Sequence, residues 1–362
     1  MNSHWASAQA DARGGFFENP SRGCPGKDLC ELRGWTCFCN VRRFQQRWLD
    51  LGESPFLPKS NGPLIPMDAA LPLYVPMLRH GSKRNEVFQS PVVALSAFDL
   101  LRDAKQGYGT RCPTAEELRV RYRLRPDAQV LLVSVAKDQY LEAYWSNRNL
   151  RNVPDMLARL ALLGMTMPNY TSFVDAPSIH THWNLRRMRK NAEELTAAGI
   201  AVVPHLNART RDDWNFWTAL LEQQPAIRYV CKEFQTGLRR YEVGARHLWH
   251  IDDLQHRLGR ALHPILVGGG RFAHVAARYF ERFTIVDSVP FIKTVKRKRG
   301  VQVGGAPLKW RSNVLSGEEC LDELLSHNVA LYSHVLQERV ASAKRLIQEA
   351  VQLELPLRSI LH

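Results

Sequence analysis

Short apolar runs alternate with longer amphipathic segments from residue 71 onward, and this alternation constrains the fold more than any other feature of the chain. Eight runs are predicted to be strands, because they are short, aliphatic and bounded by turn residues. Runs such as Val130–Val135 are apolar almost without interruption, which is typical of parallel strands buried on both faces. The predicted strands are 71–77, 91–98, 130–135, 164–169, 200–206, 227–234, 263–268 and 283–289.

Helix-compatible segments separate most of these strands. Strand and helix repetition predicts a parallel sheet, and eight units favour a closed α/β barrel of the (β/α)8 TIM type. Because periodicity does not show closure, a doubly wound open sheet is the alternative. Residues 318–351 carry apolar side chains at three- and four-residue spacing, which predicts a long C-terminal helix packed on the barrel. The other predicted helices are 114–122, 153–163, 183–198, 211–223, 251–262 and 272–281.

The chain divides into three parts by its composition. Residues 1–70 form an irregular Cys-rich extension with a predicted metal site, residues 71–300 form the catalytic barrel, and residues 301–362 form a helical extension packed on it. A chain of 362 residues has room for one such barrel with two extensions, since TIM barrels typically take about 250 residues.

Charge points to the class of partner. Lys and Arg total 49 against 35 Asp and Glu, a formal net charge of +14, and such an excess attracts polyanions. The chain has no apolar run of about 18 residues, and its first residues lack the apolar core of a secretory signal. We therefore expect a cytoplasmic protein that binds nucleic acid and no membrane.

Four of the seven cysteines are clustered, at Cys24, Cys30, Cys37 and Cys39. In a reducing compartment such a cluster predicts a metal site before it predicts disulfides. Four thiolates satisfy tetrahedral Zn²⁺, and a structural zinc ion stabilises short segments that lack a core. We expect structural zinc here. An iron–sulfur cluster is the alternative, and unligated thiols are the third interpretation.

Polar residues after the last two predicted strands mark a candidate site. Gly268, Gly269 and Gly270 end one strand, where backbone amides can approach a ligand closely, and Asp287 ends the next. If these residues do not form a common site, the glycines only make a tight turn and Asp287 only caps a helix. A basic run follows at what would be the barrel mouth, and we expect it to contact phosphates, although such runs are usually solvated loops. Its members are Lys293, Lys296, Arg297, Lys298 and Arg299.

Several segments between residues 160 and 350 together resemble the tRNA-guanine transglycosylase family. The stretch from Val286 to Pro290, after a Gly-containing strand and a helix, is similar to the Phe-Asp-Cys-Val-x-Pro segment that ends the family's barrel. The stretch from His327 to Tyr332 is similar to its closing helix. Phe173-Val174-Asp175 resembles its Phe-Asp-Glu segment, and Glu233-Phe234-Gln235 is a looser match to its Val-Gln-Gly-Gly segment.

Two features of that family are missing. Its Cys-x-Cys-x-x-Cys zinc motif with a distal His is reduced to Cys320 and His327, and its Asp-Ser-Gly-Gly segment has only 95–99 as a counterpart. These departures indicate a divergent, DpdA-like branch, which inserts 7-deazaguanine bases into DNA. DNA is therefore favoured over tRNA as the polymer, within a modification system that can include helper proteins.

The resemblance implies a covalent exchange of guanine for a 7-deazaguanine base. Asp287 is the expected nucleophile at the anomeric carbon, as in retaining glycosidases. Asp175, with Glu233 as its substitute, is the expected carboxylate that holds the base edge or moves a proton. The expected substrate-binding residues are Asn169, Glu233, Gln235, Gly268, Gly269 and Gly270. Two other functions stay open: a non-catalytic barrel that binds nucleic acid, and an iron–sulfur-dependent enzyme that modifies it.

We predict that Cys24→Ser or Cys37→Ser lowers the thermal stability of the protein, because a half-liganded site loses the binding free energy of its metal. Melting curves of the purified variants measure this loss. Metal analysis of protein purified without chelator tests the site itself, and the absence of stoichiometric zinc or iron would contradict it.

Overall fold

The structure is a computed structural model that describes residues 62–104, 107–172, 178–235, 238, 240–303, 307–312 and 320–352. Eight parallel strands form its centre, and each overlaps one of the eight predicted runs. They are β1 Tyr74–Leu78, β2 Val92–Ser96, β5 Gln129–Val133, β6 Gly164–Thr166, β7 Val202–Val203, β8 Tyr229–Glu233, β9 His263–Val267 and β10 Thr284–Asp287.

The sheet closes on itself. Its strand order is β7-β6-β5-β2-β1-β10-β9-β8, so β7 and β8 are its two ends. These ends meet through the chain just after β7, where the Cys231 N–H donates to the Pro204 carbonyl at 2.7 Å and the Leu206 N–H donates to the Cys231 carbonyl at 2.8 Å. The predicted (β/α)8 TIM-type barrel is confirmed, and these bonds exclude the open sheet. The Cys-rich part of that prediction lies outside the described residues.

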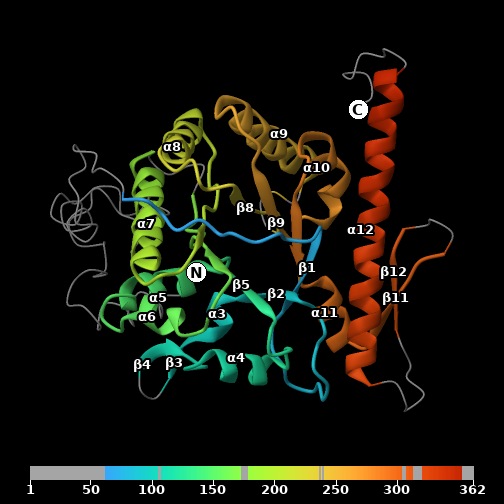
Figure 1. Cartoon of the computed structure of the whole chain (residues 1–362), viewed down its shortest axis with the longest axis horizontal. Helices are drawn as coiled ribbons and strands as arrows, with labels where there is room; N and C mark the ends of the chain where they lie inside the picture. Colours follow the sequence, from blue (N-terminus) through green and yellow to red (C-terminus); the bar gives the residue numbers. More distant parts are fainter. Residues whose placement is uncertain are drawn as a thin grey trace, which may run out of the picture.

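Helices surround the strands in chain order (Figure 1). They are α4 Ala115–Tyr122, α5 Asp138–Asn147, α6 Val153–Ala158, α7 Ser178–Ala197, α8 Arg211–Glu222, α9 Tyr241–Arg257 and α10 Ala273–Tyr279. Shorter elements lie in the crossovers: α3 Ala97–Leu100, the antiparallel pair β3 Leu101–Ala104 and β4 Gly107–Thr110, and the 3-10 turn η2 Gly270–Phe272.

One predicted helix, 251–262, is misplaced. The helix at this position, α9, runs from Tyr241 to Arg257. Gly259, just beyond it, has a φ of +62°, a left-handed conformation that glycine adopts freely after a helix end. Near its start, a Cβ on Gly244 would lie 2.3 Å from the Phe272 ring. The early turns of α9 therefore depend on a close approach to η2, which apolar spacing does not reveal.

The predicted C-terminal helix is confirmed as α12, Leu321–Gln352. Between the barrel and α12 lie α11 Val289–Val295 and an antiparallel hairpin, β11 Lys298–Val301 with β12 Lys309–Ser312. Helix α12 packs on α10 and α11, and the hairpin lies on the side of α12 that faces away from the strands (Figure 1).

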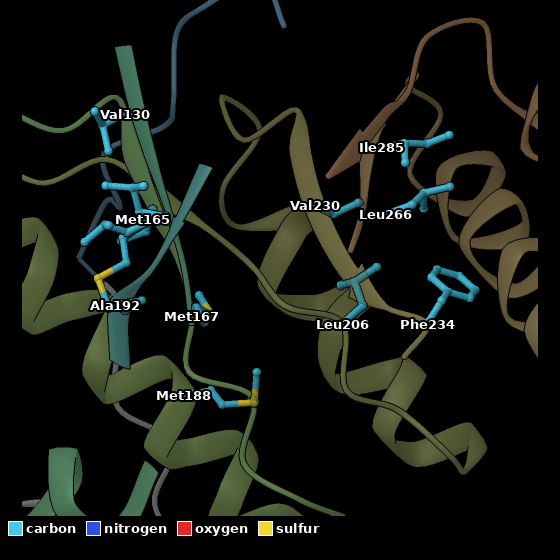
Figure 2. Packing of buried hydrophobic residues seen from close by; sticks show 14 of the residues in the cluster. Val130, Met165, Met167, Met188, Ala192, Leu206, Val230, Phe234, Leu266 and Ile285 are labelled. Carbon is cyan, nitrogen blue, oxygen red and sulfur yellow. The ribbon is translucent and has the colours of Figure 1, made fainter. Parts of the chain in front are cut away.

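Side chains alternate along the strands between two apolar clusters. Cys231 of β8 and Val286 of β10 belong to the inner cluster, which fills the barrel. Val230 and Ile285 belong to the outer cluster, between strands and helices, and Figure 2 shows this packing. The alternation therefore decides which residues at the strand ends face the barrel interior.

The N-terminal end of the barrel is covered by residues 62–73. Met67 and Leu71 enter the inner cluster. The Tyr229 hydroxyl donates to the Ala69 carbonyl, and the Thr284 hydroxyl donates to the Pro72 carbonyl at 2.8 Å. The opposite end, where the strands finish, is where TIM-barrel enzymes place their chemistry.

A buried ion pair joins α5 to α7. The two Nη atoms of Arg187 donate to the two carboxylate oxygens of Glu142, each at 2.8 Å. Both side chains are buried, and the guanidinium carbon lies 3.7 Å from the centre of the Tyr170 ring. The pair is therefore enclosed by protein.

We expect Glu142→Ala to lower the free energy of unfolding by about 3–5 kcal/mol, because it leaves the Arg187 charge buried without its counter-ion. Glu193→Ala is the matched control, since Glu193 pairs with Arg189 on the same helix at a more exposed position, where such pairs contribute about 0–1 kcal/mol. Urea unfolding measures both, and equal losses would contradict the expectation.

Candidate active site

Six of the predicted site residues lie at the C-terminal ends of three adjacent strands. Glu233 ends β8 with Gln235 two residues on, Gly268, Gly269 and Gly270 follow β9, and Asp287 ends β10. Gln235 packs directly on Gly268, where a Cβ would lie 2.4 Å from the Gln235 Cγ. Parallel pairing thus brings together residues that are up to 54 positions apart, from Glu233 to Asp287.

Asp287 is held by hydrogen bonds to both carboxylate oxygens. Its Oδ1 accepts the backbone N–H of Val289 at 2.9 Å, and its Oδ2 accepts the hydroxyl of Tyr332 at 2.9 Å. The residue is 6% exposed. Burial raises the pKa of Asp287 above its usual value, while the hydrogen bonds from Val289, Tyr332 and Ser288 oppose the rise. These donors favour the anion at a position where burial disfavours it.

The side chains of Asp287 and Glu233 face opposite sides of the barrel wall. Asp287 follows Ile285 of the outer cluster by two residues, and its partner Tyr332 lies on α12. Glu233 follows Cys231 of the inner cluster by two residues, and its Oε1 accepts the backbone N–H of Gln235 at 2.8 Å. Glu233 is therefore the inward-facing carboxylate of the cluster, and Asp287 lies between β10 and α12. By accepting the Val289 N–H, Asp287 also stabilises the start of the short helix α11, whose N-cap residue is Ser288. This structural role is the simpler interpretation of Asp287.

His205 is a further candidate, outside the set of site residues predicted from the sequence. It follows β7, pairs with Cys231 in the closure of the barrel and is 1% exposed. Neither ring nitrogen has a hydrogen-bond partner in the part of the chain that the structure describes. Burial, and then the charge of Lys232, lower the pKa of His205 to about 3. A neutral imidazole with an unpaired donor and acceptor thus lies in the barrel wall. In the sequence, this residue is marked only by its position, as a His at the end of an apolar run.

Among the remaining predicted site residues, Asn169 is not brought into this cluster. Asn169 follows β6, which β7 separates from β8, and its N–H donates to the Ser134 carbonyl at 3.1 Å. Asp175 lies outside the described residues, as do Cys24, Cys30, Cys37 and Cys39. Their proposed roles stay predictions.

The basic run lies along α11 and β11, both of which pack on α12, and its expected phosphate contacts stay a prediction. Lys298 and Arg299 belong to β11. Asn328 of α12 holds this strand: its Nδ2 donates to the Lys298 carbonyl at 2.9 Å and its Oδ1 accepts the Gly300 N–H at 2.8 Å. Lys296 and Arg297, at the end of α11, are exposed. Lys293, on α11, lies 5.8 Å from the centre of the Trp310 ring.

Comparisons with known proteins identify no family. No family model matches the chain, and no curated protein matches it. Among solved structures, a putative fructose-1,6-bisphosphate aldolase from Coccidioides immitis is similar over 75% of this chain and 93% of its own, with 11% identity and a TM-score of 0.41. A likeness this distant carries no argument about function.

No helix among the described residues is long and apolar enough to cross a membrane. No group of three or more His, Cys, Asp or Glu side chains in the described segments is arranged to hold a metal ion.

We predict that His205 makes the fold sensitive to mild acid. Its pKa of about 3 in the folded protein lies below the unfolded value of about 6.5, so the unfolded chain binds more protons between these values. Its contribution to stability is complete above pH 6.5 and is lost as the pH falls, by about 2 kcal/mol between pH 7 and pH 5. In His205→Leu, the loss of unfolding free energy between these pH values should shrink by that amount. Urea unfolding at both pH values measures it, and a loss equal to that of the unmodified protein would contradict the assignment.

Proposed function

We propose that this chain is a nucleic-acid base transglycosylase, a pentosyltransferase that exchanges guanine for a 7-deazaguanine base, with DNA as the polymer. One observation carries the proposal: a hydrogen-bonded carboxylate, Asp287, lies at the C-terminal end of β10 beside the Gly268–Gly270 turn, and Gln235 packs on Gly268 of the same turn. These are residues that the resemblance to tRNA-guanine transglycosylases assigns to the nucleophile and to the base.

The reaction needs one carboxylate to serve as nucleophile and then as leaving group. A carboxylate oxygen of Asp287 attacks C1′ of the nucleotide while the bond from C1′ to N9 of guanine breaks, and guanine leaves with the bonding electrons and takes up a proton. The incoming base loses its N9 proton and attacks C1′ from the opposite side, and the ester bond to Asp287 breaks. Two inversions give net retention, as in retaining glycosidases.

The surroundings of Asp287 suit that role. A nucleophile must be anionic when it attacks, and a buried carboxylate stays anionic only where donors offset its desolvation. The N–H of Val289 and the hydroxyl of Tyr332 supply such donors. Glu233 and Gln235 face the same end of the barrel, and their oxygens are acceptors that match the N–H donors of a guanine edge.

The partner and the metal follow from charge and from cysteine chemistry. The formal net charge of +14 attracts a polyanion, and the exposed Lys296 and Arg297 are suited to phosphate contacts. Zinc at Cys24, Cys30, Cys37 and Cys39 has a structural role in this proposal, because four thiolates leave the ion no open position for substrate.

A second candidate function has one specific observation in its favour. Both carboxylate oxygens of Asp287 are already bonded, and the side chain faces α12. If this residue only caps α11, the chain is a barrel that binds nucleic acid without changing it. The two functions differ in two observable species: the polymer carrying the exchanged base, and the covalent intermediate between the protein and the polymer.

We expect Asp287→Asn to lower base exchange at least about a thousandfold, because the amide keeps the shape of the side chain and lacks the anionic nucleophile. The assay mixes the protein with guanine-containing duplex DNA, or with tRNA in a parallel arm, and a radiolabelled 7-deazaguanine. Label retained by the polymer measures exchange, and a protein–polymer adduct on a denaturing gel measures the covalent intermediate.

The matched control is Asp253→Asn, a partly exposed carboxylate on α9 that pairs with Arg257, which should exchange as the unmodified protein does. Full exchange in Asp287→Asn refutes this nucleophile. Loss of exchange in Glu233→Gln, with an adduct still formed by a folded Asp287→Asn, moves the nucleophile to Glu233. Binding to DNA without any adduct or exchange supports the non-catalytic barrel.

A further inference from the structure

The C-terminal helix reaches the candidate nucleophile through one side chain. Tyr332 lies on α12, is 9% exposed, and donates its hydroxyl to Oδ2 of Asp287 at 2.9 Å. The two residues are 45 positions apart. We infer that Tyr332 is a positioning residue of the reaction: it orients the Asp287 carboxylate and keeps it anionic, so that α12 belongs to the active site. The inference rests on the proposed function of Asp287.

A second tyrosine fixes this arrangement from the other side. Tyr74 of β1 packs edge to face on Tyr332, with ring centres 5.2 Å apart and planes at 65°. Its hydroxyl donates to the backbone carbonyl of Asp287 at 3.3 Å. Both rings are buried, so the Tyr332 ring has little freedom to turn away. One tyrosine contacts the carboxylate and the other contacts the main chain of the same residue.

Gly270 has no side chain, and the Tyr332 hydroxyl occupies the space that a side chain at this position would take. A Cβ at position 270 would lie 2.1 Å from the Tyr332 oxygen and 3.5 Å from Oδ2 of Asp287. The first distance is far inside van der Waals contact, so any side chain at position 270 displaces the hydroxyl. Seven residues along α12, Arg339 donates to the Gly270 carbonyl at 3.3 Å. The same face of α12 therefore holds both the glycine turn and the carboxylate.

The groups that act on the Asp287 carboxylate come from β1, α11 and α12. Burial raises its pKa, and the hydrogen bonds from the Tyr332 hydroxyl and from the start of α11 lower it. The buried Tyr74 is a further neighbour on β1, and Arg339 is the cation that α12 places near Tyr332. Removing the Tyr332 hydroxyl takes away one stabiliser of the anion. The folded-state pKa of Asp287 then rises further, and the carboxylate becomes protonated at a higher pH.

The test is Tyr332→Phe, which keeps the ring and its packing against Tyr74 and removes only the hydroxyl. We expect kcat for base exchange at neutral pH to fall about ten- to a hundredfold, the range for a hydrogen bond to a charged group, with KM for DNA little changed. The acidic limb of the pH profile of kcat should move to higher pH. A merely structural role of Tyr332 would not shift that limb.

Two further variants complete the experiment. Gly270→Ala should produce the same shift of the acidic limb, because its Cβ displaces the hydroxyl while Tyr332 itself is unchanged. Tyr140→Phe is the matched control, since Tyr140 is 45% exposed on α5, and its profile should equal that of the unmodified protein. Circular dichroism melting confirms that each variant is folded, and Gly270→Ala provides the test if Tyr332→Phe does not fold.

A carboxyl titration separates failure of this inference from failure of the proposed function. Carbon-13 NMR of labelled aspartate follows the Asp287 carboxyl directly and needs no activity. An Asp287 pKa that is higher in Tyr332→Phe than in Tyr140→Phe shows that Tyr332 stabilises the Asp287 anion. If no variant exchanges bases as well, it is the proposed function that fails and not the role of Tyr332 toward Asp287. An unchanged Asp287 pKa, or an unshifted acidic limb in active Tyr332→Phe, overturns it.

Discussion

Closure of the barrel between the end of β7 and β8 is the constraint on which the rest of the structure depends. Two backbone hydrogen bonds at Cys231 join these ends, and they turn an eight-stranded sheet into a ring. In this ring all the carboxyl ends of the strands lie at one mouth, and the parallel pairing of β8, β9 and β10 makes Glu233, the glycines after β9 and Asp287 neighbours there. The same closure buries His205 beside Cys231, which leaves an imidazole with no hydrogen-bond partner among the described residues.

The candidate site depends, in turn, on the C-terminal helix α12. This helix is a late element of the chain, yet it supplies Tyr332 to Asp287 and Arg339 to Gly270, and its Asn328 secures β11 and α11. The stretch from His327 to Tyr332 that resembles the closing helix of tRNA-guanine transglycosylases therefore has a physical meaning here. Asn328 ties α11 and β11 to α12, Tyr332 ties α12 to Asp287 at the end of β10, and Val329 packs against the outer cluster.

The two carboxylates of the cluster illustrate how a strand end can serve stability and chemistry together. Asp287 accepts from the first turn of α11, as a helix cap does, and from a tyrosine that favours its anion. Glu233 faces the interior and is held by the turn that follows it. A residue bound this firmly loses little entropy on reaction, which suits a nucleophile, and the same bonds would be required of a purely structural cap. Chemistry on the polymer, and not geometry alone, distinguishes these roles.

The local pattern of the sequence determined the eight strands, the long C-terminal helix and the barrel class, because burial on both faces and amphipathic spacing leave their mark on neighbouring residues. It also pointed to Glu233, Gln235, Gly268–Gly270 and Asp287, since each follows an apolar run. Only tertiary structure decided the rest. The start of α9 depends on the close approach of Gly244 to Phe272. Asn328 holds β11 on α12, and the orientation of Asp287 depends on Tyr332, 45 residues away. Contacts between residues so distant in the chain produce no periodic pattern in the sequence. Which residues meet is therefore decided only by the closure of the barrel and the packing of α12.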